Sequence, residues 1–244
     1  TLTDALTKVT QYAYDANNNR VSAKDPLNNL TQFAYDVKDL LTTTTDALSS
    51  TQTITYDALD RKIATEDKNN NTSNFDYDAV GNLTQVTDPL SNATTFTYDA
   101  NGNRLTTKDP LNNSSFAVYD ALNRVLSESD PLGNTATKVF DALGRVTSST
   151  NPKSQTTSFS YDALGRMLQV TDPNGGKVNY TYDLNGNRLS TKDPNGNTTN
   201  YVYDKLNRLI QKTEPLGNIT TYGYDAAGNR TSVTDPKGNT INYT

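Results

Sequence analysis

A repeat of 21 residues without insertions or deletions constrains this chain more than any other feature. A Tyr-Asp pair marks each repeat, and Phe140 replaces the tyrosine once. The marker residues are Tyr14, Tyr35, Tyr56, Tyr77, Tyr98, Tyr119, Phe140, Tyr161, Tyr182, Tyr203 and Tyr224. All nine prolines share one other slot of the repeat, mostly as Asp-Pro. Such regularity requires every unit to stack on its neighbours in one fixed geometry.

Each repeat reads as two strands and two turns. In 198–203, Tyr201 and Tyr203 are two residues apart and so share one face of a strand. Asp204 opens a turn in which Asn207 suits positive φ, and a second strand leads to the Glu-Pro-Leu-Gly-Asn turn at 214–218. The sequence therefore predicts an all-β, solenoid-like superhelix of antiparallel β-hairpins. A parallel β-helix with one coil per repeat is the alternative, but these turns suit hairpins better.

The domain organisation follows from the repeat rather than from the length. We expect one continuous array over residues 1–244, with about 11.5 repeats and no linker. The sequence lacks an initiator Met and begins and ends inside a repeat, which predicts a segment of a longer chain whose flanks are unknown.

A longer period, in which every fourth repeat is alike, is also present. Asn101-Gly102-Asn103-Arg104-Leu105 recurs four repeats later as Asn185-Gly186-Asn187-Arg188-Leu189. Duplication of a four-repeat block explains this recurrence. A second hypothesis is that eight strands form one superhelical turn, which would give a thin rod filled by side chains.

The composition excludes several classes of function. The chain has no cysteine and no histidine, and no carboxylate stands out from its repeat equivalents, so we expect neither an enzyme nor a cofactor. The net charge of −5 disfavours binding to nucleic acid. No apolar run approaches the roughly 20 residues that a membrane-spanning helix needs. The hydrophobic content is only 33%, so the aromatic residues are the main apolar resource.

Three features of the repeat are candidate sites. Asp99 with Asn101, and Asp183 with Asn185, resemble parts of calcium loops, although turn chemistry explains the same residues. The aromatic positions predict a buried stacked layer; if exposed, they would suit stacking against carbohydrate. Arginines that follow the turn predict structural ion pairs with its aspartate or contacts with the backbone. These are Arg61, Arg124, Arg145, Arg166 and Arg208.

Tyr-x-Tyr-Asp-x-x-Gly-Arg/Asn-x-Leu combined with Asp-Pro-x-Gly-Asn resembles the Rhs or YD repeat over essentially the whole chain. That family includes bacterial Rhs and wall-associated proteins, toxin-complex shells and teneurin-like proteins. The resemblance implies a hairpin sheet that coils into a spiral, often around a cargo domain. It also implies a secreted or cell-surface protein, here of bacterial type.

The expected function is structural: a segment of an extracellular fibre or spiral scaffold. The wall of a hollow shell around a toxin cargo is the first alternative, and an adhesion module for glycans or protein partners is the second. The expected partners are further repeats of the same or identical chains, joined end to end in a fibre, with toxin cargo or a surface glycan in the two alternatives.

Overall fold

The computed structural model describes residues 1–3 and 8–243, which form strands and turns and contain no helix. The all-β prediction is therefore confirmed. The chain divides into two compact units, Thr1–Asn123 and Arg124–Thr244, and each is described by itself. The predicted array over 1–244 includes residues 4–7 and 244, which lie outside the described residues, and its continuity as one domain stays a prediction.

Each unit is a series of short strands, most of them of six and five residues in alternation. Unit 1 contains β1 (Leu2–Thr3), β2 (Val9–Tyr14), β3 (Arg20–Lys24), β4 (Leu30–Tyr35), β5 (Leu41–Thr45), β6 (Thr51–Tyr56), β7 (Lys62–Glu66), β8 (Thr72–Tyr77), β9 (Leu83–Thr87), β10 (Ala93–Tyr98), β11 (Arg104–Lys108) and β12 (Ser114–Tyr119). Unit 2 contains β13 (Val125–Ser129), β14 (Thr135–Phe140), β15 (Val146–Thr150), β16 (Thr156–Tyr161), β17 (Met167–Thr171), β18 (Lys177–Tyr182), β19 (Arg188–Lys192), β20 (Thr198–Tyr203), β21 (Leu209–Thr213), β22 (Ile219–Tyr224), β23 (Arg230–Thr234) and β24 (Thr240–Asn242).

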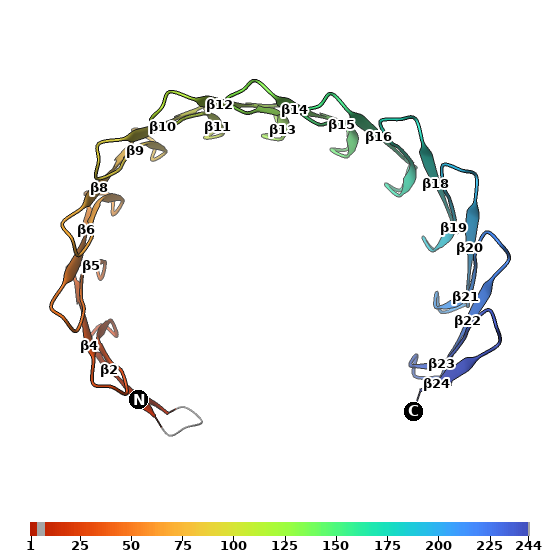
Figure 1. Cartoon of the computed structure of the whole chain (residues 1–244), viewed down its shortest axis with the longest axis horizontal. Helices are drawn as coiled ribbons and strands as arrows, with labels where there is room; N and C mark the ends of the chain where they lie inside the picture. Colours follow the sequence, from red (N-terminus) through yellow and green to blue (C-terminus); the bar gives the residue numbers. More distant parts are fainter. Residues whose placement is uncertain (4–7, 244) are drawn as a thin grey trace. The chain divides into compact units, whose positions relative to one another are not determined.

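Within each unit the described strands pair antiparallel with their sequence neighbours, so each unit is a meander (Figure 1). For example, β21 pairs with β20 through Asn200↔Thr213 and with β22 through Thr213↔Ile219. The predicted hairpin array is confirmed, and the parallel β-helix alternative is wrong. The reason is local, because both five-residue turns reverse the chain directly and leave no segment for a parallel crossover.

Two kinds of turn alternate along the meander. The Tyr-Asp turns run from the aspartate after each marker residue, as in 204–208, and the Asp-Pro turns occupy the proline slot, as in 214–218. Every Tyr-Asp hairpin whose register is described contains a β-bulge: Val202 pairs with Gln211 but Tyr203 pairs with Leu209, so Ile210 has no partner in the register. A bulge increases the local twist and bends the strand. The Asp-Pro hairpins pair only near their turn, as Gln211↔Thr221 to Thr213↔Ile219 shows.

The two faces of the sheet differ in chemistry. One carries the marker residue and the position two residues before it, and we call it the aromatic face. The other carries mostly Thr, Ser, Asn and Gln. In β4 and β16 the aromatic-face residues are half-buried and the intervening residues are exposed. None of the residues whose burial is described is fully buried. The prediction of a buried aromatic layer is therefore wrong in degree, because a single-layer sheet covers its rings only with neighbouring side chains.

The hypothesis of a filled rod with eight strands per turn is wrong as well. Each unit holds twelve strands, so such a turn would close within one unit and bury its inward side chains. Instead, the described strands of each unit contact only their sequence neighbours, and no described side chain is fully buried. The four-repeat recurrence has a local counterpart in the chemistry of the Tyr-Asp turns, described next.

Candidate functional site: the aromatic face and the Tyr-Asp turns

The aspartate that opens each turn organises it. In the turn 57–61, Asp57 Oδ1 accepts hydrogen bonds from the backbone N–H of Leu59 (2.9 Å) and of Arg61 (3.0 Å). The backbone N–H of Asp57 donates to the Arg61 carbonyl at 2.9 Å, and that of Asp60 donates to the Asp57 carbonyl. Asp60 has a φ of 65°, in the left-handed region where the sequence places Gly, Asn, Asp or Ser. Asp-Pro turns use the same scheme, as at Asp25.

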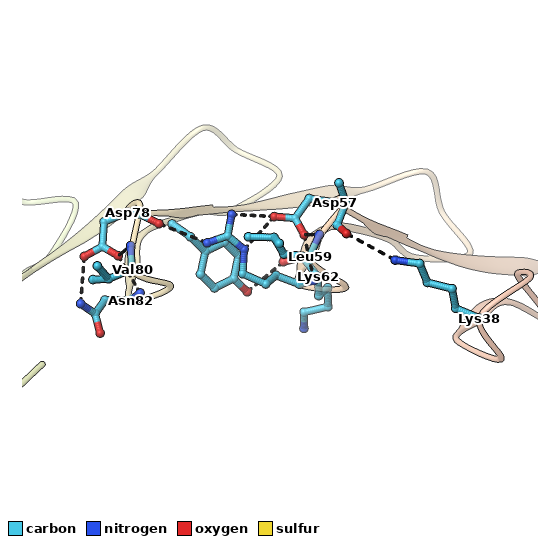
Figure 2. Close-up of polar contacts among 10 residues, drawn as sticks. Lys38, Asp57, Leu59, Lys62, Asp78, Val80 and Asn82 are labelled. Carbon is cyan, nitrogen blue, oxygen red and sulfur yellow. Dashed lines mark hydrogen bonds and ion pairs between the residues drawn. The ribbon is translucent and has the colours of Figure 1, made fainter.

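In four described repeats an arginine then ties its turn to the next one. Arg61 donates from Nε to Asp57 Oδ2 at 2.7 Å and from Nη1 to the carbonyl oxygen of Asp78 in the following turn at 3.1 Å. Its guanidinium carbon lies 4.8 Å from the ring centroid of Tyr77. Figure 2 shows Asp57 and Asp78 in these two successive turns. Arg145, Arg166 and Arg208 repeat the arrangement.

We call this arrangement the arginine staple. It confirms the predicted ion pair and backbone contact for those four residues, and it adds the contact with the ring, which the sequence reasoning missed. Arg124, the fifth arginine at this position, lies 4.5 Å from the ring centroid of Phe140. The paired guanidinium lowers the pKa of Asp57, chiefly through the side-chain hydrogen bond from Arg61 and then through the backbone N–H of Arg61.

The tyrosine hydroxyl makes a second bridge at the same place. Tyr77 Oη donates to the carbonyl oxygen of Lys62 at 2.9 Å, across the gap between β8 and β7. The register of that strand pair ends at Ala64↔Asn74, so the bridge closes the splayed end of an Asp-Pro hairpin. The same bond is made by Tyr35, Tyr56, Tyr98, Tyr119, Tyr161, Tyr182 and Tyr224. The marker tyrosine thus holds consecutive hairpins together.

Three described repeats carry asparagine in place of the arginine and form an amide bridge to the next turn. Asn103 Nδ2 donates to Asp99 Oδ2 at 2.8 Å and to Asn123 Oδ1 in the next turn at 2.7 Å. Asn101 Nδ2 donates to the same Asn123 oxygen at 3.1 Å. Equivalent bridges join Asn185 and Asn187 to Asn207, and Asn17 and Asn19 to Asp39. Successive bridges are four repeats apart, which gives the long period a structural meaning.

The calcium candidates lie in these amide bridges. Asp99 uses Oδ1 for the backbone N–H groups of Asn101 and Asn103, and Oδ2 for the Asn103 amide. Asp183 is held by Asn187 in the same way. These hydrogen bonds lower the pKa of both carboxyls, with the asparagine side chain as the largest cause. In residues 1–3 and 8–243 no group of three or more acidic side chains could hold a metal ion. Calcium binding at Asp99, Asn101, Asp183 and Asn185 stays a prediction.

A second row of cations covers the aromatic face at the first residue after alternate Tyr-Asp turns. Arg20 lies 4.6 Å from the ring centroid of Phe33, and Arg188 lies 5.0 Å from that of Tyr201. Each also lies within 6 Å of a ring on the preceding strand. Sequence reasoning missed this row, although an arginine or lysine recurs there in every second repeat except at Val146. The rings are thus half-buried beneath cations and do not form a bare stacking platform.

Comparison with known proteins identifies the repeat. The RHS repeat profile matches residues 1–30, 77–114, 119–153, 140–177, 168–198, 182–219 and 203–240, which together make up more than half of the chain. No curated protein matches in sequence. None of the described residues forms a helix that could span a membrane.

Two solved structures show the same fold. A crystal structure of TcdB2–TccC3 matches 93% of this chain with a TM-score of 0.59 and 18% identity. TcdB2–TccC3 without its hypervariable C-terminal region matches 93% with a TM-score of 0.58 and 18% identity. In both cases this chain spans only 14% of the matched chain. Family profile, repeat period and fold agree: the chain belongs to the RHS repeat family.

Proposed function

We propose that this chain is a stretch of wall in a larger bacterial protein, secreted or displayed on the cell surface, and that the wall encloses a cargo. The observation that carries the proposal is the single-layer sheet, in which no described residue is fully buried. A layer without a core of its own is suited to be a partition, with one face toward a cavity and the other toward solvent. The chain's role is structural rather than enzymatic.

The same observation favours the wall over a filled fibre. A solid fibre of eight strands per turn requires an interior packed with side chains. Each unit instead runs past eight strands without burying any described residue. The arginine staples and tyrosine bridges stiffen the sheet from turn to turn, which a thin wall needs because it lacks a core. Family resemblance supports a toxin domain as the cargo.

Small-angle X-ray scattering of the purified chain tests this proposal. A wall predicts a cross-section one sheet thick, roughly 10 Å, since that is the face-to-face spacing of packed sheets. Electron micrographs of the same sample should show thin ribbons or hollow particles. Uniform solid rods of at least twice that thickness would contradict the wall and restore the fibre.

Glycan binding is a second candidate because the rings are only half-buried. Tyr180 and Tyr201 of adjacent repeats flank the exposed Arg188, at 5.9 and 5.0 Å from its guanidinium carbon. A sugar would have to displace this cation to stack on the rings. The chain has no tryptophan, so its tyrosine fluorescence reports directly on the aromatic face. Titration with oligosaccharides should leave this fluorescence unchanged if the chain is only a scaffold, and a saturable change would establish binding.

A further inference from the structure

The Asp-Pro turns of unit 1 present a row of leucines to solvent. The third residue of the turn is leucine at four of five successive positions, and these side chains are 79–86% exposed; we call them the leucine row, Leu27, Leu48, Leu90 and Leu111. The turn does not require leucine. Asn69 and Asn174 occupy the same position and donate the same backbone hydrogen bond to their aspartates. The leucines therefore need an explanation outside the turn.

The leucine row is symmetric about Asn69. The third turn residues read Leu, Leu, Asn, Leu, Leu along the edge. The residues before the turns read Lys24, Thr45, Glu66, Thr87, Lys108, and the residues with positive φ read Asn28, Ser49, Asn70, Ser91, Asn112. All three series read the same in both directions. The outermost turns are identical over Lys-Asp-Pro-Leu-Asn-Asn, at 24–29 and 108–113.

A two-fold interface between identical chains joins one surface patch to itself, so each residue of one copy meets the residue at the mirrored position of the other. With the axis at Asn69, every leucine of the leucine row would meet a leucine. We propose that this edge of unit 1 binds the same edge of a second copy, with Asn69 at the two-fold axis. Leu27 then packs against the partner's Leu111, and Leu48 against the partner's Leu90. This inference does not depend on whether the sheet encloses a cargo.

The spacing and the charges fit this arrangement. Successive turns on this edge are two strands apart, about 9.6 Å. The leucines of the two copies therefore have the same spacing and can pair along roughly 40 Å of the edge. Lys24-Asp25 lies opposite the partner's Lys108-Asp109, and the reversal allows each lysine to meet an aspartate. Four leucines on each chain make a contact at the low end of the size of specific interfaces, so we expect a weak dimer that dissociates reversibly.

Sedimentation velocity of the full chain across about 1 to 300 μM tests the surface. We expect a monomer–dimer equilibrium that weakens at least tenfold in L48N/L90N, which keeps the turn because asparagine occurs there naturally. The matched control is L132N/L216N, which changes leucines at the same turn position in unit 2 that are 88% and 91% exposed. A wild-type chain that stays monomeric throughout, or a control that weakens the dimer equally, overturns the proposal.

Cysteine cross-linking tests the two-fold axis, and the chain has no native cysteine to interfere. Asn69→Cys should form a disulfide-linked dimer with itself on oxidation. Leu27→Cys should not link to itself, but it should link to Leu111→Cys when the two variants are mixed. Self-linking by Leu27→Cys, or none by Asn69→Cys at concentrations where the chain dimerises, would overturn the two-fold geometry. Circular dichroism of each variant confirms that the sheet is intact.

Discussion

The arginine staple and the amide bridge solve the same structural problem with different chemistry. Both close the gap that opens between successive Tyr-Asp turns, and both begin at the Oδ2 atom of the turn aspartate. Arg166 reaches Asp162 at 2.6 Å and the carbonyl oxygen of Asp183 at 2.6 Å, so it bonds to backbone that every sequence provides. Asn187 reaches Asp183 and Asn207, so it needs a particular side chain in the next turn.

This contrast explains how the repeat tolerates variation in sequence. An arginine staple depends on one residue in its own turn plus an aromatic ring, and nearly every repeat supplies the ring. An amide bridge depends on residues in two turns at once, which links the sequences of neighbouring repeats. That dependence accounts for the bridges being fewer and for their recurrence in the same combination at every fourth repeat.

The largest expected effect comes from removing a staple. Arg166→Ala should lower the free energy of unfolding by about 2 kcal/mol, because it deletes the hydrogen bonds to Asp162 and to the Asp183 carbonyl and the contact with the Tyr182 ring at 4.9 Å. Asn187→Ala should lower the free energy of unfolding by about 1 kcal/mol. It deletes hydrogen bonds from a neutral amide to the Asp183 carboxylate and to the Asn207 amide oxygen, and neither bond joins two charged groups. Urea unfolding followed by circular dichroism measures both, and equal losses would mean that the two junctions are energetically equivalent.

Much of this architecture could be predicted from the sequence. The 21-residue period, the alternation around Tyr201 and Tyr203, and the turn residues led to antiparallel hairpins, because turn chemistry and strand periodicity act over a few residues. The arginine–aspartate ion pair could also be predicted from the sequence, since Arg61 lies only four residues after Asp57. Burial of the aromatic residues was predicted wrongly, because the local pattern does not reveal whether a second layer covers the sheet.

The contacts between repeats could not be predicted from the sequence for a related reason. Tyr77 bonds to Lys62 fifteen residues earlier, and only the bulge and the splayed hairpin bring those atoms together. The Asn101–Asn123 contact spans 22 residues, one more than the period, so equivalent positions do not pair. The recurrence of the sequence at every fourth repeat reflects these amide bridges. Without the strand register, however, the recurrence was equally consistent with a superhelical turn of eight strands.

A smaller effect should follow from loss of the acceptor in an amide bridge. Asn207→Gly keeps the positive φ of 62° without strain but deletes the oxygen that Asn185 and Asn187 share. We expect a loss of about 1 kcal/mol in unfolding free energy from two unmade hydrogen bonds, after the relief of strain. Asn112→Gly, with a φ of 68° in an Asp-Pro turn, is the control. A matching loss in that control would assign the effect to glycine entropy instead.

Grafting a staple into an amide-bridged repeat should have a weaker effect of the opposite sign. Asn103→Arg places a guanidinium where Asp99, the Asp120 backbone and the Tyr119 ring occupy the positions that Arg61 uses in its own repeat. The gain is offset by loss of the bond to Asn123 and by crowding against Arg104, which lies 5.6 Å from the Phe96 ring. We expect a net gain of about 0.5 kcal/mol in thermal or urea unfolding. A net loss would show that Arg104 leaves no room for a staple in this repeat.

The smallest effect concerns pH, because each aspartate is one of many. The pKa of Asp57 is held below its ordinary value of 3.8, first by the Arg61 side chain, and that of Asp99 first by the Asn103 side chain. A carboxyl with a lowered pKa in the folded state contributes stability that is fully present above its ordinary pKa and is lost as pH falls through the folded value. Stability should therefore be constant from pH 7 to about 5 and fall below about 4. Asp57→Asn should be less stable at neutral pH because it lacks the ion pair with Arg61, and it should lose less on acidification because an amide does not titrate. The turn itself is kept, since the amide oxygen still accepts the backbone N–H groups, as Asn151 does naturally. Urea unfolding of both proteins at pH 7, 5 and 3 measures the difference, and an identical fall in the variant would place the acid sensitivity outside the staple.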